Sequence, residues 1–160
     1  MASWLRTWLL SRIVKSALVF EREAIDRYRG LLERIGDGPA RLGLEHLQRE
    51  EEMHWRILGE TAEGRLDQDQ LEKALHEHLY ASLEEIRPLD RGTLDLWGDE
   101  LGKALEAEKE TFIFYGNLRR MSKIPAVKKA FEVLADMEKE HVEILGKLLG
   151  VEGKAGIPRA

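Results

Sequence analysis

The sequence predicts an all-α protein: a four-helix bundle built from two repeated helical hairpins, joined by a long crossover that contains a short helix. Three observations predict this fold. Apolar residues recur at the three- and four-residue spacing of a helix along most of the chain. A tight turn containing proline divides each half. The two halves align without a gap at a shift of 87 residues, the separation between Glu51 and Glu138.

Composition narrows the class of protein. With 160 residues, the chain has the size of one domain with its own core. It holds no cysteine, which excludes disulfides, thiolate nucleophiles and cysteine-held zinc or iron in this chain. The formal net charge of -5 gives no reason to expect nucleic-acid binding. We expect a soluble cytoplasmic protein.

Residues 1–20 are apolar but contain three basic residues. They lack the uninterrupted apolar core of a secretory signal and the about 20 apolar residues of a membrane span. Trp4 and Trp8 lie at helical spacing, which leaves two interpretations. The preferred one is that the segment extends the first bundle helix and packs on the protein or on a partner subunit. The other is an amphipathic helix at a membrane surface.

The first hairpin is expected to contain helices from about Leu5 to Ile35 and from about Pro39 to Ala62. The segment 36–39 lies between them and supplies a stop, an N-cap and an early proline. Residues 67–86 have an apolar spacing of their own, which predicts a shorter connecting helix closed by Pro88.

The second hairpin is expected to begin with a helix that starts between Thr93 and Asp99 and reaches Met121. After a tight turn, the last helix should run from Pro125 to near Gly150. We predict one domain, 1–160, divided into repeat one 1–62, crossover 63–92, repeat two 93–150 and a frayed tail 151–160.

Six glutamate and histidine residues fall inside the apolar stripes of the four long helices. Two stripes contain Glu-x-x-His, a spacing that places both side chains on one helix face, about one turn apart. Each of the other two stripes contains a single glutamate. In chain order the six are Glu21, Glu51, His54, Glu108, Glu138 and His141.

The turns place these six groups at one height in the bundle, each roughly 20 Å from its turn at ~1.5 Å per residue. Unpaired buried charges cost several kcal/mol apiece, so four converging carboxylates need compensation. Two divalent cations would balance them, with one neutral histidine for each ion. The competing interpretation is chance, because a run such as 50–52 is usually a solvated face. The shared repeat and the placement in apolar stripes favour a two-metal centre.

Two tyrosines follow the single glutamates at equal distances. Tyr28 lies seven residues after Glu21, and Tyr115 lies seven residues after Glu108, two turns along the same face. Their hydroxyls could hydrogen-bond the ligand carboxylates and so contribute to catalysis. The alternative, that both are ordinary core tyrosines, is equally open.

The segments FEREAIDRY, AEKETFIFY, EEMH and EKEH resemble the rubrerythrin branch of the ferritin-like di-iron carboxylate proteins. The resemblance covers nearly the whole chain except the N-terminal segment and the tail. It implies a ferritin-like bundle holding two iron ions, although Mn or Zn would also suit the ligands. It further implies that Glu21 and Glu108 are single-carboxylate ligands, Glu51 and Glu138 bridging carboxylates, and His54 and His141 terminal nitrogen ligands.

The sequence departs from that family in two respects. Rubrerythrins usually carry a rubredoxin domain, whose iron is held by four cysteines, and an extra glutamate one turn after the third-helix ligand. This chain has no cysteine, and the corresponding position is Thr111. An external electron donor would therefore be needed.

The resemblance implies reduction of hydrogen peroxide or dioxygen in defence against oxidative stress. A ferroxidase, or an iron-binding or storage protein without turnover, is the alternative, and a metal-free structural bundle is the third interpretation. We also expect a homo-oligomer.

Overall fold

The computed structural model describes residues 3–63, 65, 67, 70, 73–75, 84–123 and 125–151, without the side chains of residues 3–10, 39 and 126. Most of the connecting helix expected over 67–86 lies outside the described residues. So do the tail from residue 152 and the side chains of Trp4 and Trp8.

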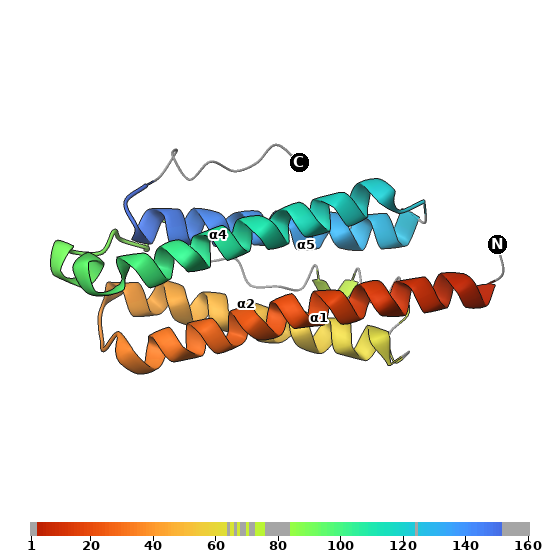
Figure 1. Cartoon of the computed structure of the whole chain (residues 1–160), viewed down its shortest axis with the longest axis horizontal. Coiled ribbons are helices and arrows are strands. Elements are labelled where there is room, and N and C mark those ends of the chain that lie inside the picture. The colour runs from red at the N-terminus through yellow and green to blue at the C-terminus, as the bar shows by residue number, and fades with distance from the viewer. Residues whose placement is uncertain are drawn as a thin grey trace.

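Four long helices make up the described bundle: α1 (Ser3–Arg34), α2 (Pro39–Ala62), α4 (Arg91–Met121) and α5 (Pro125–Leu148). Helix α1 packs mainly on α2, and α4 packs mainly on α5. Figure 1 shows these two hairpins stacked with all four helices along the long axis, and the N-terminal end of α1 extending beyond the others. The predicted all-α, ferritin-like four-helix bundle of two hairpins is confirmed.

The ends of the helices follow local backbone chemistry. Gly36 has φ 70, a left-handed conformation that stops α1, and the N-cap of α2 is Gly38, without a side-chain cap. The expected start of α4 was wrong, because the helix begins at Arg91. Asp90 caps it there: its carboxylate accepts hydrogen bonds from the Thr93 amide, at 3.0 Å, and the Thr93 hydroxyl, at 2.6 Å.

The core consists of two apolar clusters at different heights in the bundle. One includes Leu44 and Leu47 of α2, and the other includes Ile57 and Leu58 of the same helix. Residues 50–54 of α2 lie between these two clusters, and polar side chains are buried among them. The apolar clusters therefore close the middle of the bundle from both ends. No helix among the described residues is long and apolar enough to cross a membrane.

The N-terminal segment begins α1, because the helix starts at Ser3. Val14 and Ala17 are buried in the core, so α1 packs on the bundle at least from that point onward. This agrees with the interpretation that the segment extends the first bundle helix.

Candidate metal centre

All six glutamate and histidine residues singled out in the sequence come together in the middle of the bundle. Each is at most 1% exposed. They come from all four helices, so neither hairpin could assemble the group alone. Helix α1 supplies Glu21, α2 supplies Glu51 and His54, α4 supplies Glu108, and α5 supplies Glu138 and His141.

The first candidate metal position is formed by Glu21, Glu51, His54 and Glu138, each of which offers one ligand atom within 4.8 Å of the others. The histidine presents its Nδ1 atom to this group. That nitrogen lies 3.2 Å from Glu21 Oε2, 3.6 Å from Glu51 Oε2 and 3.7 Å from Glu138 Oε1.

The second candidate position is formed by Glu51, Glu108, Glu138 and His141. Here His141 Nδ1 lies 2.9 Å from Glu51 Oε1, 3.4 Å from Glu138 Oε2 and 3.8 Å from Glu108 Oε2. Glu51 and Glu138 thus belong to both groups, and each turns one oxygen toward one histidine and its other oxygen toward the other. This is the geometry that two bridging carboxylates would need.

Several buried atoms of this cluster have no hydrogen-bond donor or acceptor among the described residues. They include both carboxylate oxygens of Glu138. Glu51 Oε1 and His141 Nδ1 also form no hydrogen bond, although they lie 2.9 Å apart as a charge contact. Leaving such atoms unsatisfied costs about 1–3 kcal/mol each, more when charged. Cations would satisfy them together, and a set of carboxylate oxygens and imidazole nitrogens suits iron, manganese or zinc. The residues therefore fit a pair of divalent metal ions.

The electrostatics of the cluster favour bound protons when no cation is present. Burial and the neighbouring charge of Glu51 raise the pKa of Glu21 to about 8. The same two causes raise the pKa of Glu138 well above its usual range. Burial alone would also raise the pKa of Glu51. The charge and close contact of His141 have a larger, opposite effect and hold the pKa of Glu51 well below its usual range.

The histidines respond in the opposite sense to burial. Burial lowers the pKa of His54, but the charge of Glu21 and its hydrogen bond to His54 raise it more, so the net pKa lies well above the usual value. For His141, the charges of Glu51 and Glu138 outweigh burial in the same way, and the pKa is again raised. A metal ion entering the cluster would displace these protons.

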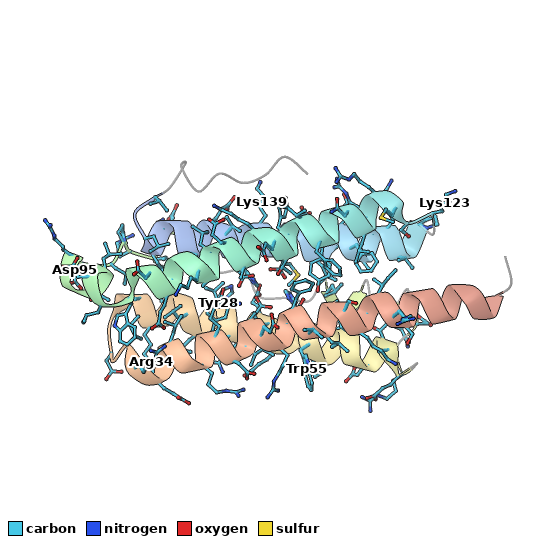
Figure 2. The ribbon with its side chains drawn as sticks, in the orientation of Figure 1. Tyr28, Arg34, Trp55, Asp95, Lys123 and Lys139 are labelled. Atoms are coloured by element: carbon cyan, nitrogen blue, oxygen red, sulfur yellow. The ribbon has the colours of Figure 1, made fainter. Side chains whose placement is uncertain are left out.

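The two tyrosines connect the hairpins at the cluster. The Tyr28 hydroxyl, on α1, donates to Glu108 Oε1 on α4, and the Tyr115 hydroxyl, on α4, donates to Glu21 Oε1 on α1. Figure 2 shows Tyr28 pointing between the two hairpins, whereas Trp55 lies on the outside of the bundle. Burial and the adjacent glutamates raise the pKa of both tyrosines, so both stay protonated as donors.

Tyr115→Phe is expected to leave the fold intact and to weaken metal binding about tenfold at the position that contains Glu21, because that carboxylate loses its fixed orientation. A Co²⁺ titration followed by absorption measures this. Tyr28→Phe is the matched variant and should weaken the position that contains Glu108 instead. Unchanged affinities in both variants would contradict the orienting role.

Sequence reasoning missed Glu50, which it grouped with the run 50–52 as a solvated face. The residue is 3% exposed, and its Oε2 atom lies 3.3 Å from His141 Nε2 in a hydrogen bond. Burial raises the pKa of Glu50, but the bond to His141 outweighs this and lowers it. A signal was present: Glu50 lies three residues after Leu47 and four before His54, at the edge of the apolar stripe.

Two further neighbours of the cluster are polar. Arg27 lies 3.9 Å from Glu108 Oε1, with its side chain 27% exposed. Thr111, where rubrerythrins carry the extra glutamate, is buried, and its hydroxyl donates to the Ala107 carbonyl at 3.1 Å. That hydroxyl is therefore engaged within its own helix.

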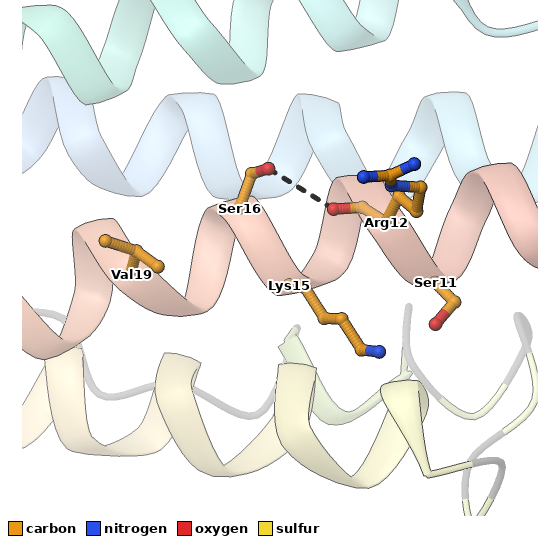
Figure 3. Close-up of a pocket in the computed structure, with 5 residues that line it drawn as sticks. All are labelled: Ser11, Arg12, Lys15, Ser16 and Val19. Atoms are coloured by element: carbon orange, nitrogen blue, oxygen red, sulfur yellow. Dashed lines mark hydrogen bonds between the residues drawn. The ribbon is translucent and has the colours of Figure 1, made fainter.

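A surface pocket of about 490 Å³ lies elsewhere, near the N-terminal end of α1. Figure 3 shows its lining, in which the Ser16 hydroxyl donates to the Arg12 carbonyl at 3.3 Å. The pocket contains none of the six cluster residues and is lined by residues of α1 alone. Its lining residues are Ser11, Arg12, Lys15, Ser16 and Val19.

Comparison with known proteins points to one family. The Rubrerythrin family model matches residues 99–157, which include most of α4 and all of α5. The matched segment contains Glu108, Glu138 and His141. No curated protein and no solved structure matches the chain.

Proposed function

We propose, from the premise that the chain is a rubrerythrin-like, ferritin-like domain, that it is a non-haem di-iron redox protein that reduces hydrogen peroxide or dioxygen. The observation that carries this proposal is the sharing of Glu51 and Glu138 between two ligand groups. Two ions so held would lie close enough to act on one small oxidant.

The bound ions would supply the redox chemistry: two ferrous ions would provide the two electrons that, with two protons, would convert one hydrogen peroxide into two waters. An external donor would then have to return the electrons. The protein side chains would hold the ions and orient the ligand carboxylates. Tyr28 and Tyr115 fix the two single carboxylates, and the apolar clusters at either end keep bulk water out.

A ferroxidase or iron-binding function is the second candidate, and one observation favours it. Rubrerythrins resemble this chain but carry an additional carboxylate at the position of Thr111. Here the Thr111 hydroxyl donates a hydrogen bond to the Ala107 carbonyl of its own helix. A site with six protein ligands and no seventh carboxylate suits iron oxidation as well as peroxide reduction.

The experiment is anaerobic loading with Fe(II), followed by oxidation with either hydrogen peroxide or dioxygen while bound iron per chain is measured. We expect about two iron ions per chain and faster oxidation by peroxide. Faster oxidation by dioxygen, with ferric mineral retained, would move the function to ferroxidase or storage. Iron near zero would remove both metal functions.

A further inference from the structure

The two candidate metal positions have unequal surroundings. Both histidines turn Nδ1 toward the carboxylates, so in each case Nε2 is the outer ring nitrogen. The outer nitrogen of His141 is hydrogen-bonded to Glu50, whereas the outer nitrogen of His54 has no partner among the described residues.

This inequality originates in the sequence. The shift that places Glu51 on Glu138 and His54 on His141 places Glu50 on Met137. Glu50, on α2, reaches across to the histidine of α5. Its counterpart Met137, on α5, is 2% exposed and brings no acceptor to the histidine of α2. The repeat is therefore broken at the residue next to each shared glutamate.

Glu50 is itself held in place. Its Oε2 atom bonds His141 Nε2, and its other oxygen, Oε1, lies 3.8 Å from His46 Nε2. With 3% exposure, its carboxylate is buried between two imidazoles and has few alternative orientations. A buried carboxylate without a hydrogen-bond donor costs free energy. The ring N–H of His141 supplies such a donor to Glu50, and this contact offsets the cost of burial.

The consequence appears when a metal ion occupies Nδ1, because the remaining proton of each neutral imidazole must then sit on Nε2. At His141 that N–H donates to Glu50, which also orients the ring and raises its basicity toward the metal. At His54 the N–H would be buried without an acceptor among the described residues. Carboxylate partners of this kind typically change metal affinity by about 10–100-fold.

We propose that Glu50 is a positioning residue that makes the two metal positions unequal, so that the position containing His141 fills before the position containing His54. This inference rests on the proposed two-metal centre and adds an order of loading to it. The first ion to bind contacts Glu108 and His141, and the second contacts Glu21 and His54.

The test is a Co²⁺ titration of the metal-free 160-residue chain, followed by visible absorption and calorimetry. Wild type should bind two ions in steps that differ by at least about tenfold in affinity. Glu108→Gln should remove the tight step and Glu21→Gln the weak one, which assigns the steps to positions.

Glu50→Met copies the residue that the other repeat carries. It should weaken the tight step by about 10–100-fold and merge the two steps. Glu50→Gln keeps an oxygen acceptor for the Nε2–H, so it should restore part of the tight step and its absorption spectrum. Met137→Glu should tighten the weak step. The control is Glu52→Gln, an exposed neighbour with a side-chain exposure of 48%, which should change neither step.

The outcomes separate the two proposals. If two Co²⁺ ions bind but Glu50→Met and Glu50→Gln leave both affinities within about twofold of wild type, the role of Glu50 is overturned and the two-metal centre stands. If wild type binds no Co²⁺, the two-metal centre itself fails. Circular dichroism of each metal-free variant shows whether it has folded. Should Glu50→Met not fold, the isosteric Glu50→Gln decides.

Discussion

Glu138→Gln is expected to remove nearly all bound metal and at the same time to stabilise the metal-free protein. Glu138 contributes to both ligand groups, and neither of its oxygens has a hydrogen-bond donor among the described residues. Burial and the charge of Glu51 raise its pKa, so the ionised side chain is a cost to the fold when no cation is present. Glutamine keeps the shape and removes that charge.

We expect bound metal to fall from two ions per chain to near zero, and the free energy of unfolding of the metal-free protein at pH 8 to rise by about 1–3 kcal/mol. Elemental analysis and urea unfolding measure the two effects. Glu143→Gln on the same helix, with a side chain 41% exposed, is the control and should change neither.

Glu108→Ala sharpens the comparison, because Glu108 belongs to only one ligand group. It should leave about one ion per chain. A Glu138→Gln protein that keeps two ions would contradict the shared-carboxylate geometry. A metal-free Glu138→Gln protein less stable than wild type would contradict the electrostatic argument.

The sequence was sufficient to predict the four long helices and the clustering of the six glutamate and histidine residues, because both follow from one pattern. In each long helix the glutamate or histidine takes the place of an apolar residue in the apolar stripe, whose members are three or four residues apart. Leu47, Glu51 and Leu58 therefore share a face, and all three are buried. The gap-free repeat then relates the two halves, because one shift superposes both the single glutamates' segments and the Glu-x-x-His pairs.

The sequence could not assign partners across the bundle. Tyr28 bonds the glutamate of α4 rather than the one on its own helix, because the packing of the hairpins decides which side chains meet. Glu50 was missed because a carboxylate next to a ligand on a helix normally faces water. Its burial depends on its reach to His141 on α5, which helical periodicity does not encode.

The metal-free protein is expected to lose stability as the pH rises from about 5 to about 9, the reverse of ordinary acid denaturation. The folded-state pKa of Glu21 is about 8 against a usual value of 4.5. A carboxyl group with a raised pKa binds its proton more strongly in the folded state. Its stabilising contribution is therefore present below pH 4.5 and is lost as the pH rises through 8.

The histidines act in the same direction. The pKa values of His54 and His141 are raised above 6.5, so their contribution is present below that pH and is lost as the pH rises through the folded-state values. Glu51 does not oppose this trend, because its lowered pKa gives a contribution that is lost only on acidification below 4.5. Each pKa unit corresponds to about 1.4 kcal/mol, so the total loss should be several kcal/mol.

Urea unfolding of chelator-treated and Co²⁺-loaded protein at pH 6, 7, 8 and 9 measures this prediction. The loaded protein should show the opposite trend, because metal binding requires deprotonated ligands and its stabilisation therefore grows with pH. Glu21→Gln should flatten the slope of the metal-free protein, since it removes one of the titrating groups. Metal-free stability that rises between pH 6 and 9 would mean that the four carboxylates of the two ligand groups are compensated without a cation. The electrostatic case for the metal centre would fail with it.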